Sequence, residues 1–341
     1  MRTTHRRSFR VTAGAFAGLT VLSLGLAACG GEEEPGADPQ EAVDAPEAEE
    51  PATWPLTGLP ADEGAEQDHP VLVVKMDNTE ASAPQEGLGS ADLVVEELVE
   101  GGITRLAAFY YSDIPGVVGP VRSVRASDIG IVSPADGTLV TSGGAQVTLG
   151  RLKEAGIPLV SEGSEGFRRD DTRSAPYNLF ADLSAVAKAQ AGEAARPDDY
   201  LPWGTAADLP KGKPATSLTA DFGSHATNWT FENGTYVNQN TYAAEGEEFP
   251  ADSVLVLRVD VGDAGYLDPA GNPVPETLFE GEGQAQLFHD GKVVEGTWTK
   301  DGLEDAISLS TRDGELTVPA GRVWIELVPV DAKNGSVTYQ K

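Results

Sequence analysis

The sequence has few of the residues that build disulfides and metal sites. It contains one cysteine, Cys29, and four histidines in 341 residues. A single cysteine can form neither an internal disulfide nor a thiolate metal cluster. The histidines lie far apart, and none stands at the spacing of a ligand pair; they are His5, His69, His225 and His289. We therefore expect no metal site, and we expect the protein to work without a cofactor.

Basic residues are also scarce, with 24 Lys and Arg against 54 Asp and Glu. Residues 1–28 contain four Arg and no acid, so a mature chain without them carries a net charge of 20 − 54 = −34. Binding to a phosphate backbone requires a basic face, and we therefore expect no nucleic acid as a partner. A chain with this large a negative charge stays soluble and repels anionic polymers.

Residues 1–28 have the pattern of a bacterial export signal. A basic segment, residues 1–10, precedes an uncharged run that ends in L-A-A-C at Cys29. This ending matches the lipobox, where a peptidase cuts before a cysteine that carries diacylglycerol. A transmembrane helix is the alternative, because 18 uncharged residues approach the minimum span, but Gly, Ala, Ser and Thr dilute the run. R-R-S-F at residues 6–9 also resembles a twin-arginine signal, with an ordinary basic segment as the alternative.

Lipidation of Cys29 would anchor the mature protein to the extracytoplasmic face of the cell membrane, because two acyl chains give stable attachment. Residues 29–53 then form an acidic spacer, with nine acids and no base between Glu32 and Glu50. This composition is typical of a disordered chain. Such a spacer would hold the folded part clear of the lipid headgroups, and a calcium-binding acidic tail is the alternative.

Hydrophobic patterns divide the remaining sequence into two regions. The first combines continuous apolar runs, such as residues 71–76, with a helix pattern at residues 145–155 that Gly156 closes. The second has a period of two and carries Asn-Gly and Asp-Gly pairs between short runs, as β-hairpins do. We therefore expect an α/β (α+β) fold with a mixed-sheet first domain and a mainly antiparallel β second domain. The expected organisation is a signal peptide (1–28), an acidic spacer (29–53), the α/β domain (54–190), a linker (191–216), the β-rich domain (217–332) and a tail (333–341).

A charged hairpin is expected in the first domain. Two apolar segments meet at E-G-G, where glycine tolerates the positive φ of a turn. A two-residue turn at residues 101–102 would pair Leu98 with Arg105. Arg105 would then lie diagonal to both Glu96 and Glu100 on one face of the hairpin.

Arginine is concentrated in the first domain, where seven of the 11 arginines of the mature chain fall between residues 105 and 173. Pro120 suits the first position of a helix, which would place Arg122 and Arg125 on one face. Guanidinium groups bind anions through paired hydrogen bonds. One interpretation is an anion pocket beyond the strand ends, at a helix N-terminus. The residues expected to line this pocket are Arg122, Arg125, Arg173, Gly143, Gly144 and Asn178.

An internal ion-pair network is the alternative interpretation of these arginines, and a network can also shape a pocket. The acids expected as its partners are Glu96, Glu100, Asp128, Asp170 and Asp171. Acid–base catalysis is a further hypothesis, with Glu96, Glu100 and Asp170 as candidate carboxylates. Ser142 lacks the G-x-S-x-G context of a serine nucleophile.

Several motifs carry a resemblance to a known family. They are V-E-G-G-I-T-R (residues 99–105), G-P-V-R-S-V-R (119–125), R-D-D-T-R-S-A-P-Y-N (169–178), G-T-W-T-K (296–300) and G-R-V-W-I (321–325). In this order the chain resembles the YerB-like family of bacterial lipoproteins over residues 54–332. The resemblance implies a lipoprotein location and an architecture, but it implies no activity.

The sequence departs from that family in two places. The family usually has histidine in the place of Tyr177 and often near residues 141–144, so no role of an imidazole is carried over. We therefore expect a binding or scaffold module of the cell envelope, with an envelope ligand or a protein partner. An envelope hydrolase that acts on cell-wall glycan or peptide through carboxylates is the alternative. A partner-binding surface would be indicated by an exposed apolar patch with Trp203, Trp229 or Trp298.

Overall fold

The computed structural model of the protein describes residues 52–341, apart from residues 63–64, 66, 193–194 and 332–334. The expected signal peptide, Cys29 and the spacer up to residue 51 lie outside the described residues. The described residues belong to one compact unit. None of the helices that they form combines the length and the apolar composition that a membrane crossing requires.

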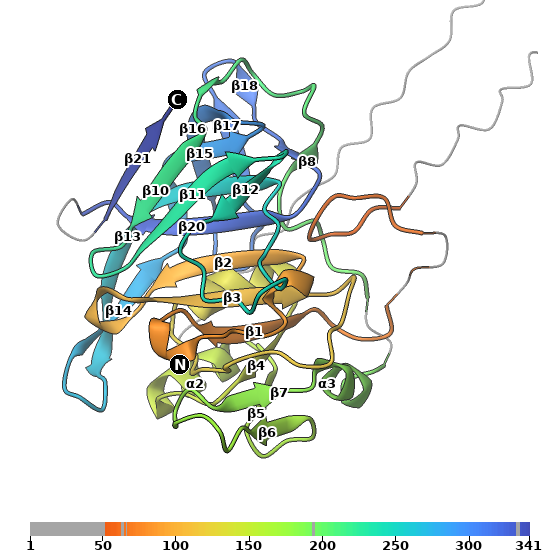
Figure 1. Ribbon diagram of the computed structural model, residues 1–341, viewed down its shortest axis with the longest axis vertical. Helices are drawn as coiled ribbons and strands as arrows, with labels where there is room; N and C mark the ends of the chain where they lie inside the picture. Colours follow the sequence, from red (N-terminus) through yellow and green to blue (C-terminus); the bar gives the residue numbers. More distant parts are fainter. Residues whose placement is uncertain (1–51, 63–64, 66, 193–194, 332–334) are drawn as a thin grey trace, which may run out of the picture. The chain divides into compact units, whose positions relative to one another are not determined.

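One mixed sheet of 13 strands runs through both regions of the sequence (Figure 1). Its strands follow the order β18 (Gly314–Glu315), β17 (Ser308–Thr311), β16 (Lys292–Lys300), β15 (Gly281–His289), β13 (Ser253–Leu267), β20 (Val323–Pro329), β2 (Leu93–Leu98), β3 (Thr104–Tyr110), β1 (Leu72–Asp77), β4 (Thr138–Thr141) and β5 (Leu159–Ser161). Two further strands pair at its sides, β14 (Pro273–Leu278) with β13 and β9 (Lys213–Pro214) with β16.

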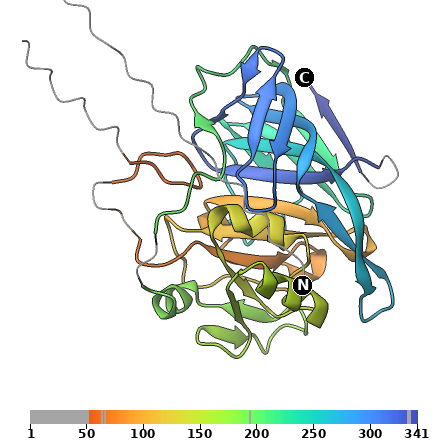
Figure 2. The ribbon, with the colours of Figure 1, turned by 180° about the vertical axis from the view of Figure 1, so that it is seen from behind.

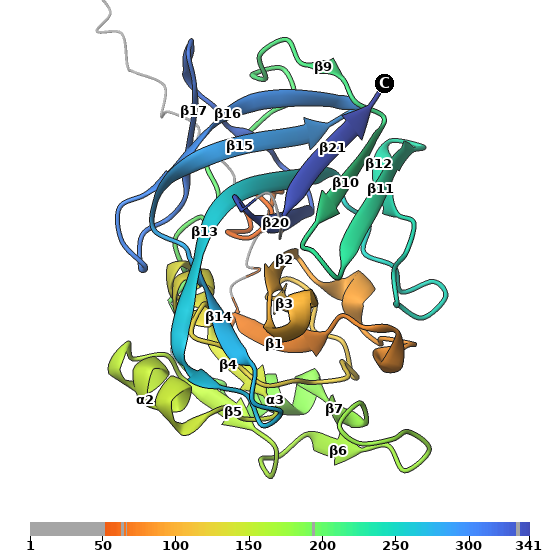
Figure 3. The same cartoon turned by 90° about the vertical axis from the view of Figure 1, so that its left-hand side faces the viewer.

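The two regions of the sequence meet at β20. This strand lies between β13 and β2 and runs parallel to both (Figure 3). Parallel pairs also join β1 to β4 and β4 to β5, whereas the other pairs along the sheet are antiparallel. The mixed first region and the β-rich second region confirm the expected fold class. The division into two domains stays a prediction from composition, and both regions contribute strands to this sheet.

Each face of the sheet is covered by a different layer. A four-stranded antiparallel sheet covers one face, in the order β12 (Thr235–Asn238), β11 (Ala226–Glu232), β10 (Ser217–Asp221) and β21 (Ser336–Gln340). Helices α1 (Asp128–Val132) and α2 (Gln146–Glu154) lie on the opposite face (Figure 2). Neighbouring side chains of β2 show this division, because Val94 belongs to the same core cluster as Trp229 of β11, whereas Val95 belongs to the cluster that contains Ile131 of α1.

The remaining elements are short. They are α3 (Leu183–Ala189), the strand pair β6 (Phe167–Arg169) and β7 (Leu179–Ala181), the strand pair β8 (Trp203–Gly204) and β19 (Val318–Pro319), and the 3-10 helices η1 (Glu80–Ser82), η2 (Leu88–Ser90), η3 (Glu100–Gly102) and η4 (Ser133–Ala135). The segment expected as a linker, residues 191–216, contains β8 and β9. Tyr200 in this segment is fully buried and donates a hydrogen bond to the carbonyl of Ile131, so the segment packs into the core.

Local sequence signals predicted several elements correctly. The expected helix is α2, and Gly156 follows its C-cap with a positive φ of 76°. The hairpins expected at the Asn-Gly and Asp-Gly pairs, residues 233–234, 290–291 and 313–314, are β11–β12, β15–β16 and β17–β18. In the first two, both residues of the Asn-Gly or Asp-Gly turn have positive φ, which explains why these pairs predict hairpins.

The expected register of the hairpin at residues 101–102 was wrong by one residue. Leu98 pairs with Thr104 and Glu97 pairs with Arg105, because the turn contains the three residues of η3 rather than two. A shift of one residue moves a side chain to the other face of a strand. Arg105 therefore lies opposite Glu97 and not diagonal to Glu96.

The helix expected from Pro120 was also wrong. Residues 120–124 are extended, and α1 begins only at Asp128. Val121 bridges Met76 at the end of β1, so backbone pairing with a neighbouring strand outweighs the local preference for a helix.

Candidate functional site

The candidate site lies where β1 and β4 end. These parallel strands pair only from Leu72 to Val74 on the β1 side, and residues 120–124 fill the gap that opens beyond. The amide of Arg122 donates to the carbonyl of Lys75 at 2.7 Å, and the amide of Ser142 donates to the carbonyl of Arg122 at 3.1 Å. Ligands of open α/β sheets commonly bind beyond the carboxyl ends of parallel strands. The inserted segment thus places Arg122, and Arg125 directly after it, at a favoured position for a ligand.

Three guanidinium groups gather at this edge, and we call Arg105, Arg122 and Arg125 the arginine site. Nε of Arg122 lies 3.3 Å from Oδ2 of Asp77, and Nη2 of Arg125 lies 2.5 Å from Oε1 of Glu100. Nη1 of Arg105 donates to the carbonyl of Ser123 at 2.9 Å. Burial, together with the positive charges of Arg125 and Arg122, lowers the pKa of Arg105 to about 10.

Each arginine of this site has a buried N–H group without an acceptor among the described residues. These groups are Nε of Arg105, Nη1 of Arg122 and Nε of Arg125. Ser123 belongs to the inserted segment and Ser142 follows β4. Their hydroxyl oxygens lie 3.2 Å apart. The site therefore has the capacity to donate further hydrogen bonds.

A buried lysine completes the charge balance of this edge. Nζ of Lys75 lies 2.6 Å from Oε1 of Glu97 and 2.7 Å from Oδ1 of Asp128, and all three side chains are fully buried. Burial alone would lower the pKa of Lys75, but the charges of Asp128 and Glu97 outweigh it and raise that pKa. With the arginine site and its two acids, four cations face four carboxylates. Of the acids expected in an ion-pair network, Glu100 and Asp128 belong to this set. Lys75, Asp77 and Glu97 were not expected in it.

The structure does not bring all the predicted pocket residues together. Arg173 donates to the carbonyls of Ser82 and Pro84 and lies over the ring of Phe180, with 4.8 Å from Cζ to the ring centre. Asn178 accepts from Arg169 at 2.6 Å. These two residues are held by contacts of their own and not by the arginine site.

The two glycines expected at a helix N-terminus precede the helix instead. The N-cap of α2 is Ala145, so neither Gly143 nor Gly144 belongs to its first turn. The amide of Gly143 donates to Oγ1 of Thr141, and its carbonyl accepts from the amide of Val124. These contacts hold the inserted segment in place.

The three candidate catalytic carboxylates have different surroundings. Glu100 is paired with Arg125, and Asp170 accepts from the hydroxyl and amide of Thr172 at the surface. Glu96 is fully buried on the face that the four-stranded sheet covers, and Glu326 is its partner in the parallel register of β2 and β20. Sequence analysis missed Glu326, although an acid within the apolar strand V-W-I-E-L-V-P was a detectable signal.

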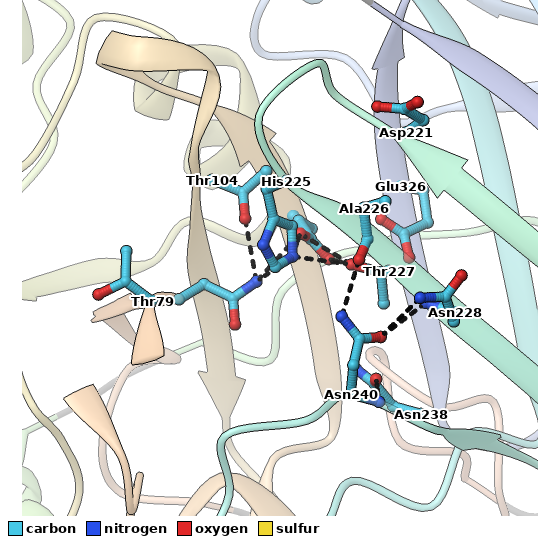
Figure 4. Close-up of polar contacts among 12 residues, drawn as sticks. Thr79, Thr104, Asp221, His225, Ala226, Thr227, Asn228, Asn238, Asn240 and Glu326 are labelled. Atoms are coloured by element: carbon cyan, nitrogen blue, oxygen red, sulfur yellow. Dashed lines mark hydrogen bonds and ion pairs between the residues drawn. The ribbon is translucent and has the colours of Figure 1, made fainter. Parts of the chain in front are cut away.

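Glu96 and Glu326, which we call the carboxyl pair, lie among polar groups from several strands. Figure 4 shows Glu326 together with His225 and Thr227. Oε1 of Glu326 accepts from the indole N–H of Trp229 at 2.8 Å, and Oε2 of Glu96 accepts from that of Trp324 at 3.2 Å. His225, in the turn between β10 and β11, places Nε2 3.3 Å from Oε1 of Glu96. Metal-ligand clusters of His, Cys, Asp and Glu are absent from the part of the chain that the structure describes.

The tryptophans named as a possible partner surface do not form one. Trp229 and Trp298 are each 1% exposed, and the indole N–H of Trp298 donates to the carbonyl of Arg258 at 2.9 Å. Trp203 is partly buried and donates to the carbonyl of Pro55. All three side chains therefore serve packing.

Comparison with known proteins identifies the family. Residues 56–196 match the model described as "Protein of unknown function (DUF3048) N-terminal domain", and residues 218–325 match the model of the C-terminal domain of the same family. The chain belongs to this family. It is 26% identical over 297 residues to the "Putative lipoprotein YerB" of Bacillus subtilis (strain 168), an alignment that covers 81% of this chain and 86% of that protein.

A solved structure supports the fold. The crystal structure of the YerB protein from Bacillus subtilis superposes with a TM-score of 0.68 at 22% identity, over 84% of this chain and 99% of that one. These similarities confirm the family resemblance found in the motifs, from V-E-G-G-I-T-R to G-R-V-W-I. They also confirm the mixed α/β architecture.

Proposed function

We propose that the protein is a membrane-anchored lipoprotein of the cell envelope that binds a small anionic ligand at the arginine site. The observation that carries this proposal is the set of three buried N–H groups, on Arg105, Arg122 and Arg125, without an acceptor among the described residues. A buried donor without an acceptor costs about 1–3 kcal/mol. A ligand oxygen that accepts from these groups would remove this cost when it binds.

The anchoring rests on the sequence and on the relative. L-A-A-C at Cys29 matches the lipobox, and the similar Bacillus subtilis protein is named as a lipoprotein. Acyl chains on Cys29 would hold the folded part at the extracytoplasmic face of the membrane. There it would meet small anions of the envelope and the carboxylates of cell-wall peptides.

The charges and exposure of the site favour a compact ligand. The side chains of Arg122 and Arg125 are 16% and 11% exposed, so only a small part of each is accessible to a ligand from solvent. Four cations and four carboxylates already balance at this edge of the sheet. One carboxylate or phosphate group therefore fits better than a polyanion, which the acidic chain would repel.

A thermal titration tests the proposal. The mature chain, purified in detergent, would be melted with inorganic phosphate, succinate or muropeptides. A ligand at one hundred times its Kd stabilises the native state by about 2.7 kcal/mol, which would raise the Tm. We expect Arg122→Gln to abolish the rise, and Arg169→Gln, which removes an exposed ion pair with Glu162, to retain it. No rise with any of these anions would contradict the proposal and favour a scaffold that binds a protein partner.

An envelope hydrolase is the second candidate, and the carboxyl pair favours it. Burial and the charge of Glu96 raise the pKa of Glu326 well above its usual range, whereas hydrogen bonds and the charge of His225 outweigh burial and lower the pKa of Glu96. A pair of carboxyl groups with separated pKa values is the arrangement of many acid–base enzymes. Glu96→Gln and Glu326→Gln variants that fold and fully complement a deletion strain would rule this candidate out.

A further inference from the structure

The carboxyl pair lies at a junction of separate elements. Glu96 belongs to β2 and Glu326 to β20, both in the main sheet. His225 lies in the turn between β10 and β11, and Thr227 and Trp229 belong to β11 of the four-stranded sheet. Polar contacts through these residues therefore connect the two sheets, inside a layer that is otherwise apolar.

The donors around the pair indicate which carboxyl group is ionised. Glu96 accepts from Nδ2 of Asn78 at 3.0 Å and from Oγ1 of Thr227 at 2.9 Å, in addition to Trp324. Glu326 accepts from Trp229 through Oε1, whereas its buried Oε2 receives no hydrogen bond from an N–H or hydroxyl group of the described residues. The several donors around Glu96 favour its ionised form. Oε2 of Glu326 has no donor of its own, so it is the natural position for a proton that Glu326 donates to Glu96.

The charge balance of the cluster indicates a second proton, on the imidazole of His225. His225 is the cation of this cluster, and its Nε2 can donate to Glu96 when the imidazole is protonated. Burial lowers the pKa of His225, but the hydrogen bond with Glu96 and the negative charges of Glu96 and Asp221 outweigh it and raise that pKa. Protonated Glu326, ionised Glu96 and protonated His225 together are neutral, which a buried cluster requires.

We propose that the carboxyl pair and His225 form a proton-dependent latch that fastens the four-stranded sheet to β2 and β20. With both protons bound, the cluster is neutral, and Thr227 and Trp229 of β11 and His225 of the preceding turn donate to the carboxyl groups of the main sheet. When Glu326 and His225 lose their protons, two carboxylates face each other in the core. Two carboxylates kept out of water are costly, and separation of β11 from the main sheet would expose both of them to solvent.

The charges around the cluster also disfavour a second carboxylate in it. The titratable groups that face the cluster from neighbouring elements are Asp77 after the end of β1, Glu80 of η1, Asp221 of β10 and Tyr242 of the loop before β13. The guanidinium of Arg122 pairs with Asp77, but Glu80 and Asp221 have no cation among the ion pairs of the described residues. Outside the cluster, the ion pairs of the described residues thus include no cation that would neutralise a second carboxylate.

The pH range of the latch follows from the directions of the three pKa shifts. Glu326 and His225 have raised pKa values, so their contributions are present below the unfolded values of 4.5 and 6.5 and are lost as the pH rises through the folded values. Glu96 has a lowered pKa, so its contribution is present above 4.5 and is lost as the pH falls through the folded value. The latch is therefore strongest in mildly acidic solution and weakens toward alkaline pH.

Hydrogen–deuterium exchange of the full mature chain in detergent tests the latch. Exchange would be followed at pH 5.5, 7 and 8.5, with correction for the intrinsic dependence of amide exchange on pH. We expect protection of β10 and β11 to fall at least tenfold more than protection of β15 and β16 across this range. Equal pH dependence in all four strands would overturn the proposal.

Two variants sharpen the test. Glu326→Gln keeps a donor to Glu96 and an acceptor for Trp229, so β10 and β11 should stay protected up to pH 8.5. Glu282→Gln, at an exposed site on β15, is the matched control and should behave as the unchanged protein. Loss of the pH dependence in both variants, or in neither, would overturn the proposal.

A second measurement needs no variant that might fail to fold. The mature chain has three histidines, so the imidazole resonances of His225 can be assigned and titrated by NMR. We expect His225 to titrate above 6.5. Titration below 6.5 would show that His225 is neutral beside Glu96 and would overturn the latch.

Discussion

Nζ of Lys75 lies 2.6 Å from Oε1 of Glu97, and water reaches neither side chain. Asp128 holds the same ammonium group from the start of α1, at 2.7 Å, so β1, β2 and α1 meet at one cation. The second oxygen of Asp128 accepts from the amide of Arg125 at 2.7 Å. This lysine thus connects the packing of α1 to the segment that carries the arginine site.

We expect Lys75→Met to destabilise the protein by about 3–5 kcal/mol, because removal of one partner leaves buried carboxylates without a cation. Urea unfolding would measure this loss. Lys213→Met is the matched control, since Lys213 pairs with Glu295 at the surface and such pairs contribute about 0–1 kcal/mol. Equal losses in the two variants would contradict the role assigned to Lys75.

Neighbouring glycines of η3 should differ in their tolerance of alanine. Gly101 and Gly102 both have a φ of 74°, but a Cβ on Gly101 would meet open space, whereas one on Gly102 would lie 2.7 Å from Oγ of Ser224. We expect Gly101→Ala to cost about 1–2 kcal/mol, the strain of a left-handed residue. Gly102→Ala should cost more, because the amide of Ser224 donates to the carbonyl of Gly102 and that turn must move.

Thermal melting of the two alanine variants checks this difference. Displacement of the turn that contains Ser224 should also disturb its neighbour His225. The imidazole resonances of His225 should therefore shift in Gly102→Ala and stay in place in Gly101→Ala. Similar melting temperatures and similar spectra for the two variants would refute the expected contact.

Trp229→Phe should destabilise the protein more at pH 8 than at pH 5.5. The indole N–H of Trp229 lowers the pKa of Glu326, so its removal raises that pKa and increases the cost of ionising Glu326. A hydrogen bond to a charged group contributes about 1.5–3 kcal/mol, against about 1 kcal/mol for a neutral one. Urea unfolding at the two pH values measures the difference.

Trp298→Phe provides the control for this variant. Trp298 is equally buried, but its N–H donates to a backbone carbonyl that does not titrate. Its loss of stability should be the same at both pH values. A pH-dependent loss in Trp298→Phe would mean that the effect at Trp229 does not come from Glu326.

Cys29→Ala should release the protein from the membrane. Without the sulfur that carries diacylglycerol, the chain keeps no acyl anchor, and the acidic mature part favours solution. Cell fractionation and a change of electrophoretic mobility would measure the loss. Continued recovery in the membrane fraction, with unchanged mobility, would contradict lipidation at Cys29.

Elements whose signals are local could be predicted from the sequence. Asn233-Gly234 and Asp290-Gly291 adopt the positive φ values that their hairpins need, and the preference comes from the residues themselves. Gly156 ends α2 for a similar reason. A continuous apolar run at residues 71–76 also marked β1, because a strand buried on both faces leaves no polar alternation.

The candidate site was only partly predictable. The concentration of arginine in the first domain predicted that Arg122 and Arg125 belong to a site. Their position, however, depends on the extended segment that enters between β1 and β4. Proline at residue 120 favoured a helix, and pairing of the backbone with Met76 overrode that preference. Arg173 and Asn178, which the same composition suggested, have other partners.

The sequence by itself determined which residues turn, which are buried and how strongly negative the chain is, because these properties depend on each residue and its close neighbours. The tertiary structure decided which charges meet. Glu96 and Glu326 lie far apart in the chain and become partners only when β20 enters the sheet beside β2. Register, strand order and the cover of each face are set by packing over the whole molecule, and one residue of shift is enough to move Arg105 from Glu96 to Glu97.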